Sequence, residues 1–61
     1  MWLFVDDNMT LVNTDNVESI EVSESSIYIN TVDGKTHLYG RCVDGGEALV
    51  VLNALRTELN L

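Results

Sequence analysis

The dipeptide Asp33-Gly34 constrains the fold of this chain more than any other short segment. Runs rich in β-branched and aromatic residues, 27–32 and 36–43, lie on either side of it, which is typical of two strands. A two-residue Asp-Gly connection predicts a β-hairpin, because a type I′ turn needs positive φ at both central residues. A loop of this length sets five strand pairs: Val32–Lys35, Thr31–Thr36, Asn30–His37, Ile29–Leu38 and Tyr28–Tyr39.

A second hairpin precedes the first and agrees with its register. Residues 17–23 alternate between apolar and polar side chains, which is the pattern of a strand with one buried face. A tight connection at Glu24-Ser25 sets two further pairs: Val22–Ile27 and Ile20–Ile29. One face of the sheet then carries Ile20, Val22, Ile27, Ile29 and Leu38, and the other carries Ser19, Glu21, Tyr28, Asn30, His37 and Tyr39. A slip of one residue would destroy this agreement.

The N-terminal segment predicts two short strands. Residues 2–5 form an apolar run without alternation, which favours a strand buried on both faces. The turn Asp6-Asp7-Asn8 follows, and residues 9–13 form the second strand. Residues 14–16 are Thr, Asp and Asn, whose side chains can bond their own backbone, so a second turn is expected there.

The period changes at the C-terminal end, where residues 45–60 predict a helix. Asp44 is a suitable N-cap, and Glu47 follows three residues later, as in a capping box. The apolar stripe of this helix is Ala48, Val51, Leu52, Leu55 and Leu59, while Leu49, Val50 and Ala54 lie off it. The whole chain, 1–61, is therefore expected to be one α+β domain. Its architecture is an antiparallel β-meander of four to five strands followed by one C-terminal helix packed on the sheet.

Association between copies is expected from the small size of the domain. A chain of 61 residues buries only about 60% of its unfolded surface, and small domains usually need disulfides, a metal or partner subunits. A single cysteine excludes an intrachain disulfide, and one Cys with one His is too few for a zinc site, so no metal or cofactor is expected. We therefore expect a homo-oligomer, most simply a two-fold dimer. Its interface residues are predicted to be Trp2, Phe4, Leu49, Val50 and Ala54.

The acidic balance of the chain disfavours several partners. Ten acidic residues against three cations give a net charge of −7, and such a surface repels phosphate backbones and anionic lipid. No segment reaches the roughly 18 apolar residues that span a bilayer, and residues 1–5 do not have the form of a signal peptide. The expected location is the cytoplasm, and the expected partner is another protein.

One side of the predicted sheet carries a candidate partner-binding patch. It comprises Tyr28, Asn30, His37, Tyr39 and Arg41, and Tyr and Arg are favoured at protein interfaces. The alternative is that this face stacks nucleic-acid bases, as in sheet-based RNA binders. No serine or acid is expected to form a catalytic triad with His37, so catalysis is not predicted. Cys42 is interpreted as a small buried residue, although Arg41 beside it could lower its pKa. Asp6-Asp7-Asn8 is interpreted as a turn rather than a cation site.

The order of these motifs resembles a group of small bacterial and phage proteins. The resemblance rests on VNTDNVESIEV, then the Asp-Gly hairpin, then the acid-capped helix EALVVLNAL. The same order resembles PC4-like proteins, in which a sheet precedes a dimerising helix and some of which act against CRISPR nucleases. The resemblance implies a non-enzymatic phage or mobile-element regulator, with anti-CRISPR-like inhibition as its specific form. The PC4-like alternative implies sheet-face nucleic-acid binding.

Overall fold

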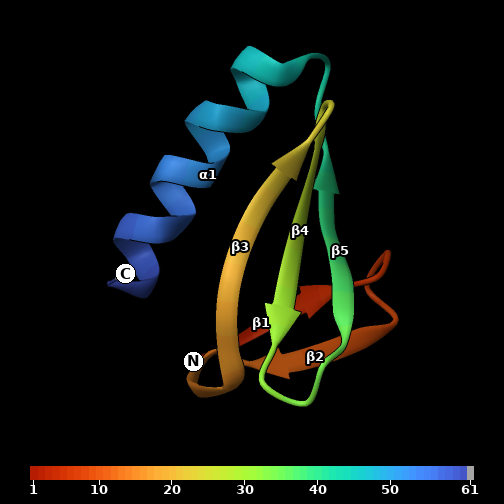
Figure 1. Ribbon diagram of the computed structural model, residues 1–61, viewed down its shortest axis with the longest axis vertical. Helices are drawn as coiled ribbons and strands as arrows, with labels where there is room; N and C mark the ends of the chain where they lie inside the picture. The colour runs from red at the N-terminus through yellow and green to blue at the C-terminus, as the bar shows by residue number, and fades with distance from the viewer. Residues whose placement is uncertain (61) are drawn as a thin grey trace.

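A computed structural model of the chain describes residues 1–60 and has an α+β fold (Figure 1). Its elements in chain order are β1 (Trp2–Val5), β2 (Thr10–Asn13), the 3₁₀ helix η1 (Thr14–Asn16), β3 (Val17–Ser23), β4 (Ser26–Thr31), β5 (Thr36–Arg41) and α1 (Gly45–Leu59). The predicted fold class, five antiparallel strands followed by one C-terminal helix packed on the sheet, is confirmed. The strands divide into two sheets, β1-β2 and β3-β4-β5.

The β1-β2 hairpin is amphipathic, although its sequence does not alternate strictly. Phe4 pairs with Leu11 and Trp2 with Asn13, so these side chains share one face of the hairpin. The other face carries Val5 and Val12, which are buried. The expectation that residues 2–5 are buried on both faces is therefore wrong for the single chain, because no other element of residues 1–60 covers the outer face.

The β3-β4 hairpin has the predicted register. Val22 pairs with Ile27 and Ile20 with Ile29, and the connection at Glu24-Ser25 has two residues. Glu24 adopts φ 57°, a left-handed conformation that glycine or asparagine would occupy at lower cost. The register shifts only between Val17 and Ser19, close to η1.

The β4-β5 hairpin does not have the predicted register. Its loop contains three residues, 32–34, because the Thr31 N–H donates to the Lys35 carbonyl at 2.9 Å. Gly34 has φ 86°, whereas Asp33 does not adopt positive φ, so the turn is not type I′. The Asp33 side chain accepts from the Lys35 N–H two residues on, as in an Asx-turn, and this bond favours the longer loop.

The longer loop exchanges the faces of β5. The observed pairs near the loop are Asn30–Thr36, Ile29–His37 and Tyr28–Leu38. His37 therefore shares the inner face with Ile29, and Leu38 lies on the outer face with Tyr28. A second irregularity, between Ile27 and Tyr28, restores the predicted register near the end of the strand, where Ile27 pairs with Gly40.

The core lies where both sheets and the helix meet. Val5, Val12, Ile29 and Leu55 form one buried cluster, so the hairpin and α1 cover the same face of the three-stranded sheet (Figure 1). The helix begins as predicted, since the Asp44 carboxylate accepts from the Glu47 N–H at 2.8 Å. Its predicted stripe faces inward, with Ala48 and Leu55 buried. In the described part of the chain, residues 1–60, no helix covers the opposite face of the three-stranded sheet.

Candidate interaction surface and the adjacent groove

The outer face of the β1-β2 hairpin carries three large apolar side chains in contact with solvent. Trp2 is 61% exposed, Phe4 60% and Leu11 51%. We call these three residues the hairpin face. Their common orientation follows from the strand period and from the pairing of Phe4 with Leu11. Isolated exposed apolar residues are ordinary, but a contiguous group marks a contact surface more often than chance allows.

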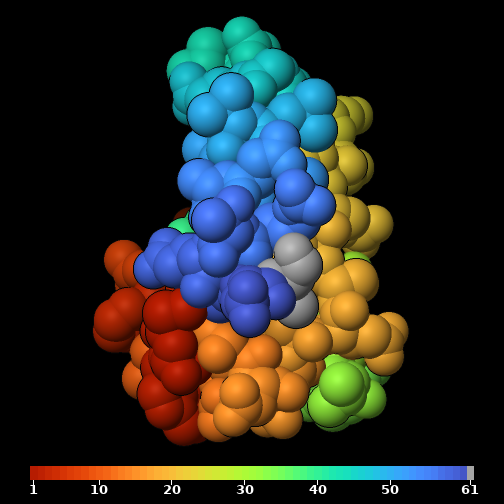
Figure 2. Space-filling model, turned by 90° about the vertical axis from the view of Figure 1, so that its left-hand side faces the viewer, coloured from red at the N-terminus to blue at the C-terminus, as the bar shows by residue number. Residues whose placement is uncertain are grey.

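The helix adds a second group of exposed apolar residues. Leu49 is 53% exposed and Val50 69%, and Ala54 is also exposed. All five residues predicted for an oligomer interface are thus accessible in the single chain, and their role as an interface stays a prediction. Figure 2 shows that the outer side of α1 and the N-terminal segment are visible from the same side of the molecule.

Around Asn30, the outer face of the three-stranded sheet carries bonded polar side chains, and Tyr28 and Leu38 lie on the same face. The Asn30 amide donates to Ser19 Oγ at 3.0 Å and to Glu21 Oε1 at 3.2 Å. The Thr36 hydroxyl donates to Asn30 Oδ1 at 2.7 Å. Asn30 therefore joins all three strands across this face, which is well suited to water.

The predicted partner-binding patch does not form one surface. Tyr28 and Asn30 lie on the outer face of the three-stranded sheet, whereas His37 and Tyr39 lie on the inner side, and Tyr39 packs against the core cluster. Arg41 is exposed, and its guanidinium donates to Asp7 Oδ1 at 3.0 Å. The shared face assumed for these five residues is wrong because the β4-β5 loop is one residue longer than predicted. Whether any of them contacts a partner stays a prediction.

A hydrogen-bonded contact that the sequence did not indicate joins the hairpin to the sheet. His37 Nδ1 lies 2.7 Å from Asp6 Oδ2, and the Leu38 N–H donates to Asp6 Oδ1 at 2.9 Å. The Asp6 N–H donates to the Leu38 carbonyl at 2.7 Å. An acid therefore lies beside His37, where the predicted register placed Asn30 and Tyr39. The two residues are 31 positions apart, and only the docking of the hairpin brings them together.

The geometry of the Asp6-Asp7-Asn8 loop explains how Asp6 reaches the sheet. All three residues have positive φ, between 55° and 66°. Asp and Asn tolerate this left-handed conformation better than most residues, which explains why these residue types occupy the loop. The bond from His37, followed by the Leu38 N–H, holds the pKa of Asp6 below its ordinary value. Asp6 is therefore ionised at neutral pH and acts as an acceptor.

Cys42 and the acidic side chains are the remaining candidates for reactivity or metal binding. Cys42 is half-buried, and burial raises the pKa of its thiol, with the Glu47 and Asp44 carboxylates adding to the effect. Arg41 therefore does not activate this thiol as the sequence allowed. Across residues 1–60, no three His, Cys, Asp or Glu side chains are grouped closely enough to hold a metal ion.

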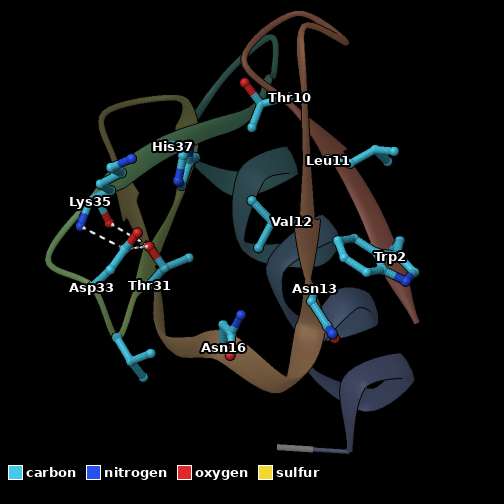
Figure 3. A pocket seen from close by; sticks show the side chains of 11 residues that line it. Trp2, Thr10, Leu11, Val12, Asn13, Asn16, Thr31, Asp33, Lys35 and His37 are labelled. Carbon is cyan, nitrogen blue, oxygen red and sulfur yellow. Dashed lines mark hydrogen bonds between the residues drawn. The ribbon is translucent and has the colours of Figure 1, made fainter.

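A groove of about 380 Å³ runs between β2 and the turn that joins β4 to β5 (Figure 3). Its volume falls within the range of about 300–1,000 Å³ typical of small-ligand sites. Trp2, Val12, Asn16, Asp33, Lys35 and His37 are among the residues that line it. His37 thus faces the groove while its Nδ1 is held by Asp6.

No protein-family model, curated protein or solved structure matches this chain. Within residues 1–60, no helix combines the length and the hydropathy that a membrane crossing requires.

Proposed function

We propose that this protein is a non-enzymatic interaction module that self-associates through the hairpin face and acts by binding another protein. The observation that supports the proposal is the alignment of Trp2, Phe4 and Leu11 on a sheet face that no other element of residues 1–60 covers. Tryptophan and other aromatic residues are enriched at the centres of interfaces, where they supply most of the binding energy.

The exposed area is consistent with the centre of an interface. An aromatic side chain can bury 150–250 Å², so Trp2 and Phe4 at about 60% exposure leave roughly 180–300 Å² in water. A standard interface buries about 800 Å² on each partner. The hairpin face therefore supplies the apolar centre of a contact, and Leu49, Val50 and Ala54 extend it in the proposal.

The acidity of the chain supports a basic partner. The net charge of −7 attracts positively charged surfaces, and complementary charge accelerates association. In its specific form, the protein is a cytoplasmic phage or mobile-element regulator of the anti-CRISPR-like kind, which blocks a nucleic-acid channel by charge mimicry. Competition with duplex DNA for a basic nucleic-acid-binding protein tests this form, and a contact that is insensitive to salt contradicts it.

The nucleic-acid-binding alternative has less support. It required Tyr28, His37, Tyr39 and Arg41 on one face, and the observed register divides them between two faces. The net charge opposes phosphate contacts as well. We therefore place protein contact first.

The only tryptophan of the chain provides a direct test of self-association. As the protein is concentrated from nanomolar to micromolar, the emission of Trp2 should shift to shorter wavelength, because the indole leaves water. Changing Phe4 to Ser should abolish the shift, while changing the exposed Val43 to Ser should leave it intact. Emission that stays constant with concentration, with the fold retained, contradicts the proposal.

A further inference from the structure

The two edges of the three-stranded sheet are in different states. At the β5 edge, the Asp6 N–H donates to the Leu38 carbonyl and the Asp6 carboxylate accepts from the Leu38 N–H, so the hairpin segment occupies this edge. At the β3 edge, no backbone bond from another segment of residues 1–60 reaches Ile20 or Val22. Figure 2 shows the yellow and orange atoms of β3 at the surface beside α1. The β3 edge is therefore open to a further strand.

The pairing of β3 with β4 determines which backbone groups point to the open edge. A two-residue hairpin loop is flanked by a hydrogen-bonded pair, which here is Ser23 with Ser26. Bonded and non-bonded pairs alternate along an antiparallel ladder, so Glu21 bonds to β4, whereas Ile20 and Val22 direct their N–H and C=O groups outward. Such a row of unpaired donors and acceptors is the template for strand addition.

A groove of about 250 Å³ lies between β3 and α1. Glu18, Ser19 and Ile20 all line it, although successive strand residues point to opposite faces, so the groove follows the edge of β3. Leu52 and Arg56 line it from α1, which packs more closely against β3 than against β4. Its volume is below the roughly 300–1,000 Å³ of small-ligand sites, and it suits one apolar side chain of an added strand.

The charge along β3 distinguishes between two candidate occupants of the edge. Glu18, Glu21 and Glu24 are exposed along this strand and its turn, and Arg56 is the one cation that lines the groove. If two copies paired through β3, their carboxylates would lie close together, and like charges on neighbouring strands are destabilising. A basic strand is attracted by the same carboxylates, and the net charge of −7 adds to this attraction.

We propose that the β3 edge binds an extended basic segment of a partner protein as an added antiparallel strand. Apolar side chains alternate with lysine or arginine along this segment. One apolar side chain enters the groove against Ile20 and Leu52, and the cations lie on the other face near Glu21. The direction is antiparallel because such pairing is the more stable per residue. This inference rests on the proposed binding of another protein, and it assigns that contact to a surface separate from the hairpin face.

The test is a titration of isotope-labelled protein followed by NMR, with synthetic heptapeptides as probes. One peptide alternates lysine with valine or leucine, and its control carries glutamate in place of every lysine. The lysine peptide should shift the amide signals of Ile20 and Val22 and slow their exchange with solvent, because these N–H groups gain acceptors. We expect a dissociation constant on the order of 0.1 mM that rises with salt, and no binding of the glutamate peptide.

Methylation of the peptide backbone separates strand addition from charge attraction alone. In the antiparallel arrangement, the apolar peptide residue opposite Ile20 bonds to it through its backbone N–H. Methylating the nitrogen of the central leucine should therefore weaken binding about tenfold. Methylating the nitrogen of the adjacent lysine, which faces away from β3, should weaken it less than about twofold.

Two protein variants test the edge from the other side. Val22→Pro removes an outward N–H at a position where an edge strand tolerates proline, and it should bind the lysine peptide about tenfold more weakly than Val22→Ala. Glu21→Gln should weaken binding about twofold to fivefold, the effect of one exposed charge pair. Its control, Glu58→Gln, removes a carboxylate that does not line the groove and should change nothing.

The two surfaces are tested separately. Val22 and Glu21 lie outside the hairpin face, so their variants should keep the parent's Trp2 emission shift on concentration. Loss of peptide binding with that shift retained concerns the β3 edge alone. Equal binding of the lysine and glutamate peptides, equal effects of the two methylations, or no shift up to about 5 mM peptide overturns the inference.

Discussion

Two sheet faces are left uncovered by the other elements of residues 1–60, and their side chains differ in kind. On the outer face of β3-β4-β5, the Asn30 side chain bonds to Ser19 and Glu21 of one neighbouring strand and to Thr36 of the other. The outer face of β1-β2 presents the large, mainly apolar side chains of Trp2 and Phe4, whose burial would be favourable. We therefore expect the first face to remain in water and, as proposed above, the second to be covered by another copy of the chain.

The largest expected effect is on the core that joins these two regions. Changing Ile29 to Ala should lower the free energy of unfolding by about 2–5 kcal/mol, because Ile29 is buried where hairpin, sheet and helix meet. Changing Leu11 to Ala should cost less than about 0.5 kcal/mol at concentrations where the chain is monomeric. Urea denaturation of dilute protein measures both. Equal losses would show that the outer face of the hairpin is as buried as the inner face.

The connection between hairpin and sheet gives the next effect. Changing Asp6 to Asn should cost about 1–2 kcal/mol, because it weakens the bonds to His37 and to the Leu38 N–H. Changing Asp7 to Asn removes an exposed ion pair with Arg41 and should cost about 0.5 kcal/mol or less. Thermal melts of both variants measure the difference. An Asp7 variant that is the less stable of the two contradicts the assigned role of Asp6.

The same connection predicts how stability depends on pH. Folding lowers the pKa of Asp6, so its contribution is fully present above about pH 4 and is lost as pH falls from there through the lowered pKa of the folded state. Asp33 is lowered as well and contributes to the decline in the same direction. The difference in stability between the parent and the Asp6→Asn variant should therefore shrink between pH 5 and pH 2. A constant difference would mean that Asp6 does not titrate with folding.

The two turns of the three-stranded sheet provide the smallest effects, of opposite sign. Glu24 has φ 57°, so replacing it with Gly should raise the free energy of unfolding by about 0.5–1 kcal/mol. Gly34 has φ 86° and no atom near the position of a Cβ, so replacing it with Ala should cost about 1 kcal/mol through the backbone alone. Valine at this position should cost more, since it is β-branched. Chemical denaturation measures these differences, and a Gly34 variant as stable as the parent contradicts the assigned loop.

Local sequence signals predicted the elements well and the joins between them poorly. The alternation of residues 17–23 and the Asp44 cap lie within single elements, and both the β3-β4 register and the helix start are confirmed. The turn type predicted for Asp33-Gly34 was wrong, because Asp-Gly fits both a two-residue and a three-residue loop. The side-chain bonds of Asp33 select the longer loop. The one additional loop residue places His37 and Tyr39 on the inner side of the three-stranded sheet, not on the predicted outer face.

The contact between Asp6 and His37 was beyond local reasoning for a different reason. Nothing in the hairpin sequence says where it docks, and the pair forms only through packing between segments far apart in the chain. The three successive acidic or amide residues of the loop indicated only a turn. The hairpin face was partly foreseen, since Trp2 and Phe4 were predicted at an interface, whereas Leu11 was not.

The mass of the protein in solution tests the central claim most directly. Sedimentation equilibrium at micromolar concentration should give at least twice the 6.8 kDa of one chain. The variant in which Trp2 and Phe4 are both changed to Ser should sediment as a folded single chain, with the helix and sheet signals of the parent retained. A parent protein that is fully folded and remains at 6.8 kDa at every concentration contradicts the claim that the hairpin face is a self-association surface.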